Sequence, residues 1–249
     1  MNVVYCEDYE SLSRQAAELV IAEIEKRSSL LLCAAGGNSP SGLYNELAKR
    51  AAADRKFCAE LRIIMLDEWG GLTEQDPASA AYYLRRHLLD PLGIPPERYI
   101  SFASSTTEPN QECERIRSEL AQRGPIDLCI LGLGVNGHIG FNEPAPFLLP
   151  HAHVAHLSAA TRRHSMVGSL DRKPSFGFTL GMGEIMASRR ILLLVAGTRK
   201  DRALTALLSE KVSTYSPASF LWLHGNADCL IDRTVLADRG GNRLPASAP

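Results

Sequence analysis

The sequence predicts a single α/β domain in which a mostly parallel open sheet has helices on both faces, a three-layer sandwich. Short apolar runs alternate with amphipathic stretches along nearly the whole chain, which is the pattern of repeated βα units. Runs such as IIML and ILLLV are apolar at every position, as strands covered on both faces are. The 249 residues, 45% of them hydrophobic and 22% charged, suit one large domain of this class.

Apolar runs define the predicted strands: residues 29–34, 61–66, 99–104, 127–134, 190–197 and 227–232. The amphipathic stretches between them predict helices, over residues 10–27, 41–53, 80–90, 110–123 and 199–210. We assign residues 1–240 to the domain and expect residues 241–249 to be a flexible tail. Ligands of open α/β sheets bind beyond the carboxyl ends of the strands, so the residues after each strand are candidates for one shared pocket.

Charge and cysteine usage limit the classes of partner and the compartment. The formal net charge of -1 gives no general basic surface, so neither nucleic acid nor an anionic membrane is expected as a partner. The six cysteines include no Cys-x-x-Cys pair, which is typical of a reduced cytosolic protein. No apolar run approaches the ~18 residues of a membrane span, and the first residues lack the pattern of a signal peptide. We therefore expect a cytoplasmic protein.

The most distinctive stretch is GLGVNGHIGFNEPA, residues 132–145, which follows a predicted strand. Its first glycines have the GxGxxG spacing of a dinucleotide-binding loop. Such a loop also needs a helix at the third glycine and an acidic residue about 20 positions later, and neither requirement is clearly met. Instead, the glycines would let the backbone turn so that His138 and Glu143 face one substrate, with Asn136 nearby. A histidine suits proton transfer at neutral pH, although a structural histidine is the alternative.

Three other strand ends carry unusual residues. In AGGNSP, Gly37 and the helix start at Ser39 favour a phosphate cradle, against a plain βα turn. In LDEWGG, Asp67 follows a buried strand, where desolvation would raise a carboxyl pKa toward that of a general base; a solvated turn is the alternative. Neighbouring residues on a strand point to opposite sides, so only one of Asp67 and Glu68 is expected to face the pocket. In GTRKD, Lys200 or Arg199 would close over an anion.

HAHVAH, residues 151–156, is the only cluster that looks suited to a metal ion. In a strand, His151 and His153 would share a face and His156 would not, and no carboxylate or cysteine is nearby in sequence. We therefore expect no metal site.

Taken together, AGGNSP, LDEW and LGLGVNGHIGFNEPA resemble, in order and spacing, the signatures of the hexosamine-6-phosphate deaminase and isomerase family. The resemblance covers nearly the whole chain, and it implies a modified Rossmann-like fold. The related 6-phosphogluconolactonases share the GGxxP loop and a DGH step, but they continue with an arginine after the DE pair and an HTASLFP-like run. This chain has Trp69 and HIGFNEP at those points. LDEW, the NGH step and PASFLWLH, residues 217–224, look most like the galactosamine-6-phosphate branch.

The resemblance implies that galactosamine-6-phosphate is converted to tagatose-6-phosphate and ammonia. The alternatives are deamination of glucosamine-6-phosphate to fructose-6-phosphate, lactone hydrolysis, and a sugar-phosphate-binding regulator without catalysis. Asp67 would move a proton between C2 and C1, and His138 would open the sugar ring with help from Glu143 and Asn136. The residues expected to hold the phosphate are Gly37, Asn38, Ser39, Arg162 and Lys200. No metal or organic cofactor is expected, the partner is a small amino-sugar phosphate, and a homo-oligomer is left open.

This chain departs from the family pattern in two places. The glucosamine enzymes have an aspartate where this chain has Asn136, and an amide orients a histidine ring without stabilising its cation as a carboxylate does. Regulated hexameric relatives bind an N-acetylated effector through a serine, an arginine and a lysine, whereas the matching positions here are Pro146, His153 and Ala155. We therefore expect no such activation.

Overall fold

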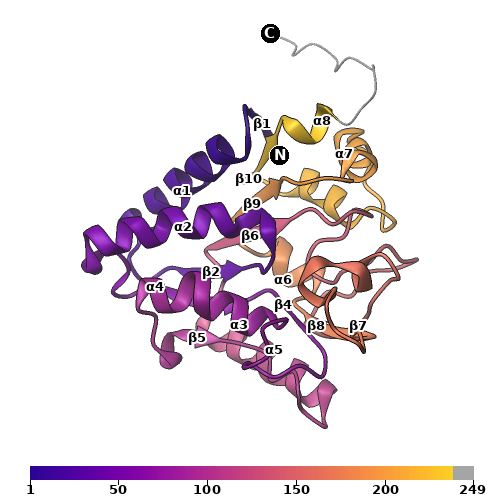
Figure 1. Cartoon of the computed structure of the whole chain (residues 1–249), viewed down its shortest axis with the longest axis horizontal. Coiled ribbons are helices and arrows are strands. Elements are labelled where there is room, and N and C mark those ends of the chain that lie inside the picture. Colours follow the sequence, from indigo (N-terminus) through magenta and orange to yellow (C-terminus); the bar gives the residue numbers. More distant parts are fainter. Residues whose placement is uncertain (238–249) are drawn as a thin grey trace.

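The computed structural model describes residues 1–237 and confirms the predicted α/β class (Figure 1). All neighbouring strands of its seven-stranded sheet pair in parallel, in the order β1-β10-β9-β6-β2-β3-β5. The strands are β1 (Asn2–Cys6), β2 (Leu31–Ala34), β3 (Arg62–Met65), β5 (Tyr99–Ile100), β6 (Leu128–Gly132), β9 (Arg190–Val195) and β10 (Ala227–Asp232). The predicted domain end at residue 240 and the predicted tail, 241–249, lie outside the described residues.

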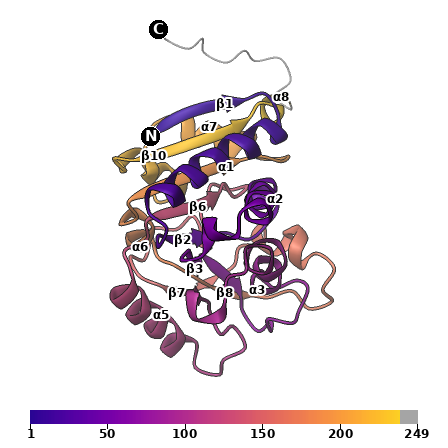
Figure 2. The ribbon, with the colours of Figure 1, turned by 90° about the vertical axis from the view of Figure 1, so that its left-hand side faces the viewer.

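Helices cover both faces of this sheet. They are α1 (Tyr9–Lys26), α2 (Asn38–Ala53), α3 (Ala80–Leu84), α4 (Asp90–Leu92), α5 (Pro109–Arg123), α6 (Met182–Met186), α7 (Asp201–Leu208) and α8 (Thr234–Ala237). Helices α1 and α2 pack against each other on one face, whereas α6 lies on the other (Figures 1 and 2). Asp8 caps α1 by accepting the Ser11 N–H at 2.7 Å, an interaction worth about 1 kcal/mol. None of the helices within residues 1–237 has the length and hydrophobicity that crossing a bilayer requires.

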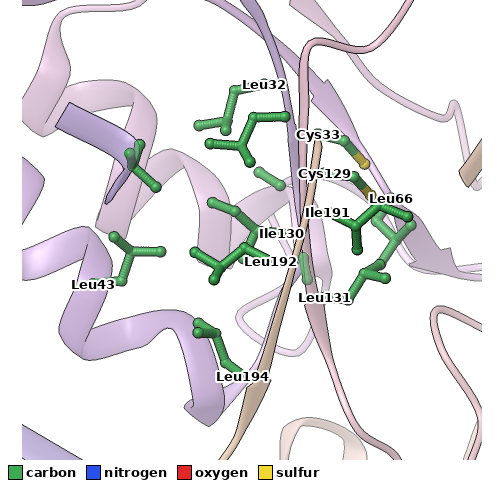
Figure 3. Packing of buried hydrophobic residues seen from close by; sticks show 14 of the residues in the cluster. Leu32, Cys33, Leu43, Leu66, Cys129, Ile130, Leu131, Ile191, Leu192 and Leu194 are labelled. Carbon is green, nitrogen blue, oxygen red and sulfur yellow. The ribbon is translucent and has the colours of Figure 1, made fainter. Parts of the chain in front are cut away.

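Side chains of the central strands alternate between the two faces of the sheet (Figure 3). Leu32, Ile130 and Leu192 point toward Leu43 of α2. Cys33, Cys129 and Ile191 point to the opposite face, and these two layers fill the core. A fully buried leucine contributes roughly 1.5–3 kcal/mol of transfer free energy, so the strands are anchored from both sides. This packing fixes where each strand ends, and therefore where the following loop begins.

A second, three-stranded antiparallel sheet was not predicted from the sequence. Its order is β4 (Asp67–Trp69), β8 (Phe176–Thr179) and β7 (His153–His156). It lies on the face of the main sheet opposite α1 and α2 (Figure 1). Strand β4 begins two residues after β3 ends, so the chain passes directly from the parallel sheet into this one. The small sheet thereby holds Asp67 at the edge of the main sheet.

Several predicted boundaries were wrong, and each has a local cause. The helix predicted over residues 80–90 begins at Ala80 as expected, continues through a π-helical turn at residues 85–89 and ends two residues late at Leu92, where Gly93 has φ of 66°. The predicted helix over residues 199–210 starts only at Asp201, because Arg199 has φ of 60° and cannot be helical. The edge strand β1 was missed because its side chains are mostly half-exposed or exposed.

Candidate active site

A pocket of about 450 Å³ lies beyond the carboxyl ends of β2, β3, β6 and β9. Residues from four segments that follow these strands line it: 35–39, 66–69, 132–138 and 196–200. A fifth lining segment, 160–166, follows β7. The structure therefore brings together the strand ends that the sequence singled out, as expected for an open parallel sheet.

One end of the pocket is the start of α2. Gly37 has φ of 96°, in the left-handed region that favours glycine, and it provides no side chain to cap the helix. The positive end of the helix dipole, at Asn38 and Ser39, therefore faces the pocket. Tyr83 fixes this turn by donating its hydroxyl hydrogen to the Gly37 carbonyl at 2.7 Å.

Lys200 lies at the same end of the pocket. Its Nζ donates to the Ser39 hydroxyl at 3.4 Å, although the two residues are far apart in sequence. Burial lowers the pKa of Lys200 to about 8, so the ammonium group is largely charged at neutral pH but poorly solvated. A helix start and a desolvated cation together form an environment that favours an anion.

Arg162 does not line the pocket, in contrast to its predicted role in phosphate binding. Both Arg162 and its neighbour Arg163 are exposed, but of the two only Arg163 lines the pocket. Thr161–Arg163 form a 3-10 turn, in which successive side chains point about 120° apart. A phosphate contact of Arg162 therefore stays a prediction.

Asp67 and Glu68 point to opposite sides of β4. Asp67 lines the pocket, where burial and the neighbouring Glu68 raise its pKa to about 7. Glu68 is fully buried and accepts backbone N–H groups from Trp69 (2.7 Å), Ala80 (2.9 Å) and Ala81 (2.7 Å). Burial also raises the pKa of Glu68 to about 7, although these N–H groups act in the opposite direction. Asp67 can therefore both take up and release a proton at neutral pH, while Glu68 anchors the start of α3.

A chain of hydrogen bonds connects His138, Asn136 and Glu143. The side-chain amide of Asn136 donates to Glu143 Oε2 at 2.8 Å, so its Oδ1 is left to accept from His138 Nδ1 at 2.7 Å. The neutral ring then carries its hydrogen on Nδ1, and Nε2 has a free lone pair. Burial lowers the pKa of His138 to about 4, so the ring is uncharged at neutral pH and can accept a proton.

Sequence reasoning missed two residues that orient Glu143. The Thr161 hydroxyl donates to Glu143 Oε1, and the Ser158 N–H donates to the same oxygen at 3.2 Å. Ser158 also accepts the Thr161 N–H at 3.1 Å, which holds this turn together. Serine and threonine are common in turns, and these contacts span 15 and 18 positions. Nothing local in AATRRHS therefore distinguishes Thr161 as part of the site.

The glycines of residues 132–145 have steric roles instead of binding a nucleotide. A Cβ on Gly134 would lie 2.4 Å from three atoms of the His138 ring, so only glycine leaves space for the imidazole. Gly137 and Gly140 have φ of 89° and 55°, and they turn the chain around the histidine. No helix begins at Gly137, so the loop lacks the geometry of a dinucleotide site.

The histidines of HAHVAH lie outside the pocket lining. The fold brings a carboxylate near one of them, since Glu184 Oε1 lies 3.8 Å from His151 Nδ1. His153 Nδ1 is 2.9 Å from the His151 carbonyl oxygen, an ordinary structural contact. Within residues 1–237, no three histidine, cysteine, aspartate or glutamate side chains are gathered as metal ligands would be.

The fold and the pocket define a class of protein: α/β proteins that hold a small ligand at the carboxyl ends of a parallel sheet. Residues 7–230 match the family of glucosamine-6-phosphate isomerases and 6-phosphogluconolactonases, and the chain belongs to this family. A relative from Escherichia coli that carries the name deaminase AgaI is 39% identical over 226 residues, covering 91% of this chain and 90% of its own. Glucosamine-6-phosphate deaminase 1 of Bacillus subtilis is 33% identical, covering 96% of this chain and 100% of its own.

Solved structures agree with this assignment. A monomeric glucosamine-6-phosphate deaminase superposes with a TM-score of 0.89 at 32% identity, covering 96% of this chain and 100% of its own. The 6-phosphogluconolactonase of Trypanosoma brucei superposes with a TM-score of 0.75 at 21% identity, covering 96% of this chain and 98% of its own. The latter likeness shows the shared fold alone.

Proposed function

We propose that this protein is an aldose–ketose isomerising deaminase that converts galactosamine-6-phosphate to tagatose-6-phosphate and ammonia. One observation carries the proposal: a single pocket joins an anion cradle to two different proton-transfer groups. The cradle is the start of α2 with Lys200, and the proton-transfer groups are the Asp67 carboxyl and the His138 ring. An isomerising deaminase needs both kinds of group, because ring opening and carbon-bound proton transfer make different demands.

Ring opening is assigned to His138. Its neutral ring would accept the proton of the anomeric hydroxyl at Nε2 and return it to the ring oxygen, which gives the open-chain aldehyde. Asn136 holds Nδ1 at 2.7 Å, so the ring keeps its tautomer and its orientation during this exchange. Glu143 supports Asn136 from the other side at 2.8 Å.

Isomerisation is assigned to Asp67. Its carboxylate would remove the C2 proton of the open-chain amino aldehyde, giving an enolamine, and the resulting acid would deliver a proton to C1. The C2 imine that forms then reacts with water, which gives the ketone and releases ammonia. A carboxyl with a pKa of about 7 suits both halves of this transfer, because neither protonation state is strongly favoured at neutral pH.

The phosphate is assigned to the part of the pocket at the start of α2. Gly37, Asn38 and Ser39 would provide helix-start N–H groups, and Lys200 would provide a positive charge. Arg162 stays in the proposal as the arginine that the sequence suggested, and Arg163 joins it because this residue lines the pocket.

The choice of galactosamine-6-phosphate rests on the sequence likeness of LDEW, the NGH step and PASFLWLH. Glucosamine-6-phosphate is the second candidate, and it is favoured by relatives that carry glucosamine-6-phosphate deaminase in their names. The two sugars differ only at the 4-hydroxyl, so both fit the chemistry assigned to Asp67 and His138.

The decisive experiment compares three substrates with the purified, chelator-treated protein: galactosamine-6-phosphate, glucosamine-6-phosphate and 6-phosphogluconolactone. Ammonia, ketose phosphate and acid release are measured in each case. We expect ammonia and ketose phosphate in equal amounts from galactosamine-6-phosphate, at a higher kcat/KM than from its epimer. Asp67→Asn should abolish both products while the substrate still binds. Acid release from the lactone without ammonia from either amino sugar would contradict the proposal.

A further inference from the structure

A histidine ring lies over the glycine that precedes α2. A Cβ added to Gly37 would lie 3.6 Å from His164 Cε1 and 3.7 Å from His164 Nε2. The ring also lies beside Trp69, with 5.9 Å between ring centroids and an interplanar angle of 36°. The Nε2 edge of His164 is therefore next to the positive end of α2, within the pocket lining.

The hydrogen bonding of the ring determines which nitrogen carries the hydrogen. The Met166 N–H donates to His164 Nδ1 at 3.3 Å, and a ring nitrogen that accepts a hydrogen bond carries no hydrogen. In the neutral ring the hydrogen is therefore on Nε2, the atom beside Gly37. His164 thus presents a donor to the same space as the first N–H groups of α2.

The charges around His164 are mostly positive. Burial, and after it the charge of Lys200, lower the pKa of His164. Arg163 of its own turn and Arg199 of the loop after β9 also line the pocket. The first residues of α2, Asn38 and Ser39, add no ionisable side chain.

Two further titratable groups share the pocket, Asp67 from β4 and His138 from the loop after β6. His138 is uncharged at neutral pH because its pKa is lowered to about 4. Asp67 gains negative charge as the pH rises through about 7, so it has to be removed in any test of His164. A dianion bound beside Gly37 would add negative charge next to the ring and favour the imidazolium form of His164. The proton would go to Nδ1, where it replaces the hydrogen bond accepted from the Met166 N–H.

We propose that His164 is a phosphate-binding residue that takes up a proton as the anion binds, so that affinity for phosphorylated ligands depends on pH. The inference rests on the proposed function only for the place where the phosphate binds, and it does not depend on the proposed reaction. The anion raises the pKa of the ring, so affinity is highest when the ring is protonated and falls as the pH rises between the free and bound pKa values. The expected loss is about tenfold for each pKa unit of that shift.

Sulfate is the probe, because it is a dianion whose own charge stays constant across this range, unlike that of phosphate. Binding is measured by calorimetry from about pH 5 to 7.5, because the pKa of the free His164 ring is lowered and that of the anion-bound ring is expected to be higher. All proteins in this comparison carry Asp67→Asn, because this substitution removes both turnover and the carboxyl group that titrates near the same pH. Asp67→Asn is compared with Asp67→Asn/His164→Gln, since glutamine keeps an N–H donor but cannot take up a proton. The matched control is Asp67→Asn/His156→Gln, because His156 is exposed on β7 and outside the pocket lining.

We expect the sulfate Kd of Asp67→Asn to rise at least about tenfold across this range, and likewise in the His156 control. In Asp67→Asn/His164→Gln the Kd should stay flat. When the measurement is extended above about pH 8, the sulfate Kd should rise in all three proteins, since the pKa of Lys200 is lowered to about 8. An equal slope with and without His164, or no sulfate binding at all, would overturn the inference.

Proton NMR gives a direct second measurement on the unsubstituted chain. The His164 ring resonance, assigned by its absence in His164→Gln, is titrated with and without sulfate. We expect sulfate to raise the pKa of this ring by about one unit or more, and an unchanged pKa would refute the inference. Neither measurement requires turnover. A failure of the deaminase assay and a failure of this inference are therefore separate results.

Discussion

Replacing Asn136 with aspartate tests the hydrogen-bond chain on which the assignment of His138 depends. The Asn136 Oδ1 atom lies 2.7 Å from His138 Nδ1, so Asn136→Asp places a carboxylate directly against the ring. Burial holds the pKa of His138 at about 4 in the present protein. A carboxylate stabilises the imidazolium, so the substitution should raise this pKa.

The size of the shift follows from two opposing charges. Unit charges about 4 Å apart attract by about 4 kcal/mol at an effective dielectric constant near 20, which corresponds to about 3 pKa units. Against this, Asn136 Nδ2 lies 2.8 Å from Glu143 Oε2, so the new carboxylate would repel Glu143. A charged His138 ring offsets part of that repulsion, because its Nδ1 lies next to the residue at position 136 and also 3.7 Å from Glu143 Oε2. We expect a net increase of roughly 1–3 units in the pKa of His138.

The assay combines NMR titration of His138 with the pH profile of kcat at saturating substrate. In the present protein kcat, measured at saturating substrate so that pH-dependent binding does not contribute, should rise with pH through about 7 with a slope of one, because Asp67 has to lose a proton. In Asn136→Asp, the His138 ring also becomes protonated as the pH falls. Two groups then have to lose a proton for catalysis, so the slope on the acid side of the rate profile should increase toward two. Asn45→Asp, at an exposed position of α2, adds the same charge away from the pocket and should leave both measurements unchanged. A His138 ring that still titrates near 4 in Asn136→Asp would refute this reasoning.

Two further substitutions test how the site is held in place. Thr161→Val removes the hydroxyl that donates to Glu143 but keeps the shape of the side chain, so kcat should fall about 10- to 100-fold with little change in KM, and Thr161→Ser should restore it. A fall in affinity alone would assign Thr161 to substrate binding instead. Gly134→Ala places a methyl group 2.4 Å from the His138 ring, so kcat should fall by about 100-fold while sulfate binding persists. Gly225→Ala meets no atom within 4 Å and should retain kcat, and an equal loss there would remove the steric explanation.

The sequence predicted the parallel sheet because its strands are buried on both faces. Leu31–Ala34 and Arg190–Val195 are almost entirely buried, so hydrophobicity alone marks where they end. The residues that follow those ends were then candidates for the site without knowledge of the strand order. Asp67, His138 and Lys200 line one pocket for this reason.

The parts that could not be predicted depend on contacts between distant segments. Strand β4 is only three residues long, Asp67–Trp69, and it forms because Phe176–Thr179 lies beside it. No periodicity is detectable over three residues, so the antiparallel sheet leaves no local signal. Similarly, which of Arg162 and Arg163 lines the pocket depends on how the 3-10 turn that contains both is oriented in the fold.

The amide at position 136 has an electrostatic rationale in this pocket. The proposed reaction requires a dianionic phosphate at one end and a carboxylate at Asp67 at the other, so each further negative charge would oppose substrate binding. Asn136 connects His138 to Glu143 through two hydrogen bonds, one donated to Glu143 and one accepted from His138, and it adds no charge. The ring then stays neutral at neutral pH, because burial is not offset by a second carboxylate in direct contact. Ring opening at His138 is therefore insensitive to pH near 7, and the proton that limits kcat on the acid side is that of Asp67.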